Sequence, residues 1–255
     1  MKVSFSIPAH NEEAVIAQCL QSVLAEIKRS GVNAEVVVVN NASKDRTREI
    51  ALGFPGVRVV DEFKKGLTYA RAAGMYATDG EIIANVDADT MLPPGWLSTV
   101  AERFSGDPKL VALSGPFIYY DLSALDRALT RGFYGIGYLL HLLNHYVLHT
   151  GAMLQGGNFV IRRDAFIRVG GFDTTIAFYG EDTDVARRLA KVGRVTWTWK
   201  LPMYASGRRL KNDGVIRTGW HYTLNHLSVI FLKRPATMVY SDIREGGAPS
   251  SLIPH

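Results

Sequence analysis

Two aspartates at the end of an apolar run could bind a cation. Asp87-Ala88-Asp89 follows the run Glu81–Val86, with one residue between the two carboxylates. Carboxylates this close repel each other unless a cation or hydrogen-bond donors lie between them. Hard divalent ions take oxygen ligands, and Mg²⁺ commonly uses one or two carboxylates together with substrate phosphates. The alternative is two solvated aspartates in a turn before Pro93-Pro94, and the D-x-D triplet alone does not separate these interpretations.

A second acidic pair, Glu181-Asp182, follows Gly180 and opens a predicted helix that ends near Lys191. Carboxylates are favoured at the positive end of the helix dipole, which accounts for Glu181 without any further role. A carboxylate in a cleft can also take the proton of a hydroxyl group as its oxygen attacks. We therefore predict that Asp182 is a general base.

Alternating strands and helices would position these carboxylates. Apolar and β-branched runs predict strands at 3–7, 35–39, 57–60 and 81–86, and apolar periodicity predicts helices at 14–27 and 67–77, with another opening at Ser43 as its N-cap. This order predicts a parallel sheet with helices on both faces, which binds ligands beyond the carboxyl ends of its strands. Asp87 and Asp89 lie in such a loop, as do the polar segments 8–12, 40–43 and 61–66. That position favours a metal site over a solvated turn.

The second half of the chain is less regular. We predict strands at 111–120, 157–161 and 195–199, and helices at 122–148, 181–191 and 221–231, with a short helix from Asp164. The last dozen residues are expected to fray. The single cysteine, Cys19, lies in an apolar helical pattern and is expected to be a small buried hydrophobic residue.

Composition limits the classes of protein. The chain has 255 residues, 47% hydrophobic and 21% charged, which is typical of a globular protein. It shows no secretory signal and no clean apolar stretch of about 20 residues, so we expect a cytoplasmic protein that is soluble or peripheral to the membrane. The net charge of +5 suits anionic partners. No helix-turn-helix, zinc-finger or RNA-binding aromatic motif is present, so we predict no nucleic-acid partner.

Ordered motifs along residues 2–199 resemble those of the family-2 glycosyltransferases, which have the GT-A fold. The motifs are Ser6–Glu13, Val38–Thr47, Gly66–Gly74, Asp87–Asp89, Gly156–Asp173 and Gly180–Leu189. Each motif alone is modest, but their joint order is specific. The resemblance implies an α/β fold, a three-layer α/β/α sandwich with a mostly parallel central sheet. We assign 1–205 to one domain, with a nucleotide-binding half (1–90) and an acceptor half (91–205), and 206–255 to a C-terminal extension that packs on it.

The resemblance also implies roles for single residues. A nucleotide-diphosphate sugar, with UDP favoured over GDP, would contact Pro8, Ala9, Asn11, Glu12, Asn41, Lys65, Arg71, Asp87, Ala88 and Gly157. Asp89 and Asp87 would hold Mn²⁺ or Mg²⁺, with His221 as a third ligand unless it is structural. Asp182 would be the catalytic base, and Glu181 would help to orient the acceptor. Asn41 departs from the family pattern, because many relatives carry an aspartate there that contacts the base of the nucleotide.

These roles predict an inverting glycosyltransferase. The divalent ion would stabilise the leaving nucleoside diphosphate as a Lewis acid, while Asp182 removes the acceptor proton. Inversion is implied by the resemblance, since family-2 enzymes usually invert. The acceptor is expected to be a hydroxyl group or a lipid-linked sugar in the synthesis of glycans or cell-envelope polysaccharides.

Two regions leave alternatives open. Arg208-Arg209 with Lys211 could bind the diphosphate, a phosphorylated lipid acceptor or only water. The apolar segments 133–143 and 224–232 could lie on an anionic membrane, pack in the core or form a homodimer contact, and we favour peripheral membrane contact.

Two other functions compete with this prediction. A sugar nucleotidyltransferase would need a glycine-rich first loop with a basic residue, which segment 8–12 lacks. A non-catalytic binding module would not need the intact set of Asp87, Asp89 and Asp182. An oxidoreductase is disfavoured because no G-x-G-x-x-G follows the first strand.

Overall fold

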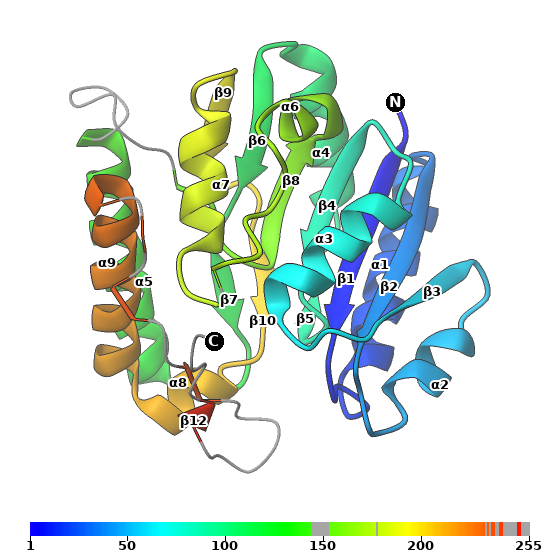
Figure 1. The fold of residues 1–255 in the computed structure, drawn as a ribbon, viewed down its shortest axis with the longest axis horizontal. Helices are drawn as coiled ribbons and strands as arrows, with labels where there is room; N and C mark the ends of the chain where they lie inside the picture. Colours follow the sequence, from blue (N-terminus) through cyan, green and yellow to red (C-terminus); the bar gives the residue numbers. More distant parts are fainter. Residues whose placement is uncertain are drawn as a thin grey trace.

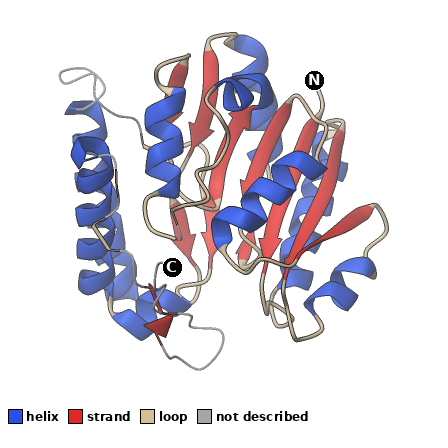
Figure 2. Cartoon of the chain, viewed as in Figure 1, coloured by secondary structure: helices blue, strands red, loops and turns tan. Residues whose placement is uncertain are grey.

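The computed structural model describes residues 1–143, 153–176, 178–232, 234, 236–237, 240–241 and 249–250. A seven-stranded sheet forms its centre, with helices on both faces (Figures 1 and 2). The strands, in spatial order, are β3 (Val57–Glu62), β2 (Ala34–Asn41), β1 (Val3–Ala9), β4 (Ile82–Val86), β8 (Asn158–Arg162), β6 (Leu110–Ser114) and β9 (Arg194–Trp197). β8 is antiparallel to both of its neighbours, and the other neighbouring pairs are parallel. The predicted α/β/α sandwich with a mostly parallel sheet is confirmed.

Two apolar layers hold the helices to the sheet. One packs α1 (Ile16–Ser30), α2 (Thr47–Leu52) and α4 (Trp96–Gly106) on one face, and the other packs α3 (Leu67–Ala77), α6 (Arg163–Arg168) and α7 (Glu181–Leu189) on the opposite face (Figure 1). Alternate residues of a strand point to opposite faces, so Ile82 belongs to the first layer and Ile83 to the second. Cys19 is buried in the first layer, as predicted.

A small second sheet connects the C-terminal part of the chain to the aspartate loop. Its strands are β5 (Thr90–Met91), β10 (Met203–Ala205) and β7 (Phe117–Tyr119), with β10 in the middle. Because Ala205 pairs with Thr90, the residues after β10 start beside Asp89. Residues far apart in the sequence therefore meet at one end of the main sheet.

A layer of helices lies beyond the β9 edge of the sheet. α5 (Ala124–Leu143) and α9 (Val215–Leu232) run side by side, and α8 (Arg208–Asp213) lies at one end of them (Figure 1). Leu122, Leu210 and Val215 form a small core there, with Tyr119 and Phe133 packed against it. Two short strands, β11 (Tyr240–Ser241) and β12 (Pro249–Ser250), pair with each other.

Two predictions of local structure are wrong. Ser43 does not cap the second helix, which begins at Thr47; its hydroxyl accepts from the Asn11 amide, and Asp45 accepts from the Thr47 amide instead. The predicted strand 111–120 divides into β6 and β7, because the chain turns at Gly115, where a Cβ atom would lie 2.0 Å from the Leu201 carbonyl oxygen. Residues 144–148 of the predicted helix 122–148 lie outside the described residues.

Candidate active site

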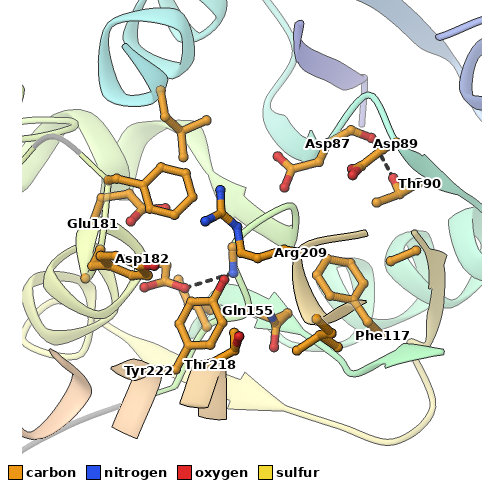
Figure 3. Close-up of a pocket in the computed structure, with 18 of the residues that line it drawn as sticks. Asp87, Asp89, Thr90, Phe117, Gln155, Glu181, Asp182, Arg209, Thr218 and Tyr222 are labelled. Carbon is orange, nitrogen blue, oxygen red and sulfur yellow. Dashed lines mark hydrogen bonds between the residues drawn. The ribbon is translucent and has the colours of Figure 1, made fainter. Parts of the chain in front are cut away.

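A cavity of about 370 Å³ opens at the carboxyl ends of β1, β2 and β4 and extends towards α5 and α9. Ten of the residues predicted from the sequence line it: Pro8, Ala9, Asn41, Lys65, Arg71, Asp87, Ala88, Asp89, Glu181 and Asp182. Figure 3 shows Asp87 and Asp89 together on one side and Glu181 and Asp182 on the other. The two acidic motifs therefore face a shared space.

The loop after β4 presents both aspartates to the cavity. The amide and hydroxyl of Thr90 donate to the Asp87 carbonyl oxygen and close a turn. The side chains of Asp87 and Asp89 are 31% and 20% exposed. Carboxylates that keep this much solvent access can exchange water or a protein partner for another ligand.

Gly157 makes room for Asp87. Its φ of +78° is in the left-handed region, and a Cβ atom at this position would lie 2.1 Å from Asp87 Oδ2. Gly157 does not line the cavity. Its observed role is to let the Asp87 carboxylate pack against β8, whereas the sequence prediction had it contact the sugar.

Arg71 is buried between the two acidic motifs. Its guanidinium donates to Asp87 Oδ1 at 3.1 Å and to Glu181, and the side chain is only 1% exposed. α3 carries Arg71 close to the sheet because Gly74, one turn later, lies against Ser6, where a Cβ atom would come within 2.0 Å of the hydroxyl. A buried cation of this kind stabilises both carboxylates and fixes the distance between their loops.

Glu181 and Asp182 differ although they are neighbours at the start of α7. Burial and the negative charge of Asp182 raise the pKa of Glu181 to about 8, while the Arg71 guanidinium opposes the shift. Asp182 accepts from the amides of Gly156, at 2.9 Å, and Thr183, at 2.7 Å. Among the described residues, Asp182 forms no ion pair, unlike Asp87, Asp89 and Glu181. It is therefore the cavity carboxylate best placed to accept a proton.

The hydroxyl of Thr183 connects Asp182 to the last long helix. It lies 3.3 Å from Asp182 Oδ1 and 3.2 Å from His226 Nδ1. Burial lowers the pKa of His226, although the charge of Asp182 opposes the shift. His226 lines the cavity, and sequence reasoning missed it because only the packing of α9 against α7 brings it there.

Asp89 has a cationic partner from the C-terminal part of the chain. Arg208, the first residue of α8, lies 3.0 Å from Asp89 Oδ2 and 2.5 Å from Glu12 Oε1. These two carboxylates raise the pKa of Arg208 even though burial opposes the shift. The sequence left the role of Arg208 open, and the structure places it at the predicted metal motif.

Besides Gly157, three other predicted site residues do not line the cavity: Asn11, Glu12 and His221. Asn11 accepts from the Lys44 amide and so connects two loops, and Glu12 is buried beneath Arg208. His221 lies beside the ring of Tyr179, with 6.5 Å between ring centroids, and not with Asp87 and Asp89. Within the described part of the chain, no group of three His, Cys, Asp or Glu side chains is arranged to hold a metal. The structure thus gives no support to His221 as a third ligand.

Asn41 lines the cavity but is already hydrogen-bonded. Its amide nitrogen donates to the carbonyls of Glu62 and Lys64, and its side-chain oxygen accepts from the Gly66 amide. Asn41 therefore holds the loop that carries Lys65 against the end of β2.

Aromatic side chains form the wall of the cavity opposite the sheet. They come from β7, α5, α9 and the loop before α7: Phe117, Tyr119, Phe133, Tyr134, Phe178, Tyr179 and Tyr222. Arg209 lies over the Phe178 ring at 4.7 Å and also lines the cavity. On α5 and α9, several apolar side chains outside the cavity are exposed to solvent, among them Leu125, Leu139, Ile216 and Trp220. Among the described helices, none is long and apolar enough to cross a bilayer.

Comparison with known proteins assigns the chain to a family. The profile described as glycosyl transferase family 2 matches residues 4–170, and that of the N-terminal domain of galactosyltransferase matches residues 144–201. The probable glycosyltransferase YdaM of Bacillus subtilis is 29% identical over 228 residues, which are 78% of this chain and 52% of YdaM. The glucosyl-dolichyl phosphate glucuronosyltransferase of Haloferax volcanii is 24% identical over 193 residues, covering 71% and 59% of the two chains. The chain thus spans little more than half the length of these relatives.

Solved structures share the fold. The mannosyltransferase PcManGT from Pyrobaculum calidifontis, in complex with GDP-Man and Mn²⁺, superposes with a TM-score of 0.68 at 22% identity, over 91% of this chain and 63% of that one. The glucosyl-3-phosphoglycerate synthase from Mycobacterium tuberculosis, with Mn²⁺, UDP and phosphoglyceric acid, has a TM-score of 0.63 at 18% identity, over 98% and 86%. At these identities the likeness is one of fold.

Proposed function

The chain belongs to glycosyl transferase family 2 and is a glycosyltransferase with the GT-A fold, and we propose that it transfers a sugar, with inversion, from a nucleotide-diphosphate sugar to a hydroxyl group. The observation that carries this proposal is the position of three carboxylates around one cavity. Asp87 and Asp89 lie at the end of β4, and Asp182 lies across the cavity at the start of α7. The first pair suits a metal-bound diphosphate, and the third suits an attacking hydroxyl.

Asp87 and Asp89 fit a hard divalent ion such as Mn²⁺ or Mg²⁺. They provide two partly exposed carboxylates and no third protein ligand among the described residues, which leaves positions for phosphate oxygens and water. When bound, such an ion supplies a Lewis acid that stabilises the negative charge of the leaving diphosphate. The Mn²⁺ complexes of both structural relatives support this assignment.

The donor would lie along the loops after β1, β2 and β3. Pro8, Ala9, Asn41 and Lys65 line this part of the cavity, and Lys65 provides a cation near the end of β3. We propose UDP as the preferred nucleotide. Donor loops and aspartates together make up the nucleotide-binding half, 1–90.

Asp182 would act as the base. The amides of Gly156 and Thr183 hold its carboxylate towards the cavity, so it can take the acceptor proton as the oxygen attacks the sugar carbon. Glu181 is less suited, because its pair with Arg71 occupies the carboxylate and burial favours its protonated form. A single base on the side opposite the diphosphate supports one displacement, which inverts the anomeric carbon.

The acceptor would enter past α5 and α9, in the half 91–205 and the extension that follows it. The aromatic wall next to Asp182 suits a sugar ring or the first part of an apolar chain. Exposed apolar side chains on α5 and α9 support peripheral membrane contact and a lipid-linked acceptor, and the Haloferax volcanii relative is named for a dolichyl phosphate acceptor.

The experiment that tests this function compares Asp182→Asn and Asp89→Asn with the unchanged protein. UDP- and GDP-sugars are screened by thermal shift with and without Mn²⁺, and transfer is then followed to a sugar free in solution and to one linked to polyprenyl phosphate in anionic vesicles. Asp182→Asn should keep donor binding and lower the transfer rate about 10²–10⁴-fold. Asp89→Asn should abolish the shift that depends on Mn²⁺. Full transfer by Asp182→Asn, or a product with the donor's anomeric configuration, would contradict the proposal.

A further inference from the structure

Arg208 occupies the position of a bound cation between Glu12 and Asp89. One of its terminal nitrogens, Nη2, lies 2.5 Å from Glu12 Oε1 and 3.0 Å from Asp89 Oδ2. Glu12 comes from the loop after β1, and it is 196 residues away from Arg208 in the sequence. This contact joins the donor loop, the aspartate motif and the C-terminal extension.

The backbone around Arg208 is fixed independently of this ion pair. The Ser206 amide donates to the Asp89 carbonyl at 3.2 Å, and Asp121 accepts from the Gly207 amide at 2.6 Å. Gly207 packs against Leu122, where a Cβ atom would come within 2.4 Å of the side chain. α8 therefore begins beside Asp89 whether or not the Arg208 side chain is paired with it.

The two carboxylates that hold Arg208 differ in their environment. Glu12 is only 1% exposed, and a buried carboxylate that loses its cation is strongly destabilised. Asp89 is 20% exposed and faces the cavity, so it has access to other partners. The pair with Glu12 is thus the anchor of Arg208, and the pair with Asp89 is the contact that can be exchanged.

We propose that Arg208 competes with the divalent ion for Asp89 and turns to the diphosphate of the donor when the ion binds, so that metal and nucleotide bind cooperatively. This inference rests on the proposed metal-dependent function. A guanidinium 3.0 Å from Asp89 Oδ2 and a divalent ion on the same carboxylate would repel each other, so each cation weakens the binding of the other. The displaced guanidinium can instead form bidentate hydrogen bonds with a diphosphate.

Thermodynamic linkage between Mn²⁺ and nucleotide makes this competition measurable in their affinities. If nucleotide relieves the competition, Mn²⁺ tightens nucleotide binding and nucleotide tightens Mn²⁺ binding by the same factor. Typical coupling factors of this kind are about 5–150-fold. Removing Arg208 should abolish most of the coupling while leaving the two aspartates in place.

The test measures Mn²⁺ binding to the full chain by electron paramagnetic resonance of free Mn²⁺, alone and with UDP or, in parallel, GDP. Arg208→Gln should bind Mn²⁺ alone about 10-fold more tightly than the unchanged protein and bind nucleotide with Mn²⁺ about 10-fold more weakly. Lys211→Gln is the matched control, because it removes the same charge from the same helix while its partner is Asp121. It should leave both affinities unchanged.

Arg208→Lys keeps the charge beside Glu12 and serves where Arg208→Gln fails to fold. It should retain weak binding of Mn²⁺ alone, because the competing cation is still present, but lose affinity for nucleotide. Unchanged or weaker binding of Mn²⁺ alone to Arg208→Gln would overturn this inference and leave the proposed function intact. No Mn²⁺ binding to the unchanged protein, even with UDP and GDP, would overturn the metal site and this inference together.

Discussion

Asp87 and Asp89 each pair with an arginine, but the two arginines differ in burial and in origin. Arg71 belongs to α3 in the first half of the chain and is 1% exposed, whereas Arg208 begins α8 and is 30% exposed. Arg71 bridges Asp87 to Glu181 at the start of α7, and Arg208 bridges Asp89 to Glu12 in the loop after β1. The motif Asp87–Asp89 is thus paired with arginines from two distant parts of the chain.

The difference in burial separates a structural cation from an exchangeable one. Both carboxylates of Arg71 are fixed by packing, since Gly157 leaves room for Asp87 and Glu181 is buried at the start of α7. Removing a buried partner leaves an uncompensated charge, whereas a partly solvated pair can be replaced by water or a ligand. Arg71 should therefore matter most for stability and Arg208 most for ligand binding.

The largest expected effect comes from removing Arg71. Arg71→Met should lower the free energy of unfolding by about 3–5 kcal/mol, because Glu181 and Asp87 lose their buried cation. Arg208→Met should cost less, about 2–3 kcal/mol, because Arg208 is itself 30% exposed and water can replace part of its contact with the buried Glu12. Urea unfolding followed by circular dichroism measures both. Equal losses in the two variants would contradict the distinction between them.

A double variant sharpens this prediction. Above about pH 8, where Glu181 is ionised, Glu181→Gln removes the charge that Arg71→Met leaves unpaired, so Arg71→Met combined with Glu181→Gln should be more stable than Arg71→Met alone. If the two changes were simply additive, the ion pair between these residues would contribute little to stability.

A smaller effect on stability is expected from replacing Gly157, which leaves room for the Asp87 side chain. Gly157→Ala should lower the free energy of unfolding by about 2–4 kcal/mol, from backbone strain at positive φ and from the clash with the Asp87 carboxylate. Gly56→Ala is the matched control, because Gly56 also has positive φ, +82°, but open space around its Cβ position. It should cost about 1–2 kcal/mol from backbone strain alone. Thermal and urea unfolding of both variants would show the difference, and identical losses would mean that Asp87 moves freely.

The last effect concerns pH. The pKa of Glu181 is raised from 4.5 to about 8, so the folded state keeps a proton that the unfolded state releases. The resulting stabilisation is complete below about pH 4.5 and is lost as the pH rises through about 8. The free energy of unfolding of Glu181→Gln should therefore fall less between pH 5 and about 8 than that of the unchanged protein. A decline of the same size in the variant would assign the titration to another group.

The structure of residues 1–90 could be predicted closely because its sequence signals are local. The β-branched run Val36–Val39 is buried in β2, and α3 covers Leu67–Ala77 as predicted. In a parallel sheet, each loop that follows a strand lies at the same edge, so strand positions alone bring Pro8, Asn41 and Asp87 together. The prediction for Asn11 and Glu12 was less accurate, because membership of a loop does not decide which of its side chains face the cavity.

Sequence by itself determined the order of strands and helices, the parallel sheet and the two acidic motifs, since each depends on the pattern of neighbouring residues. Only the tertiary structure decided which groups pair with these motifs. Glu12 and Arg208, or Thr183 and His226, approach each other through the packing of distant elements. No local pattern encodes such contacts, because they depend on the summed geometry of every strand and helix that lies between the partners.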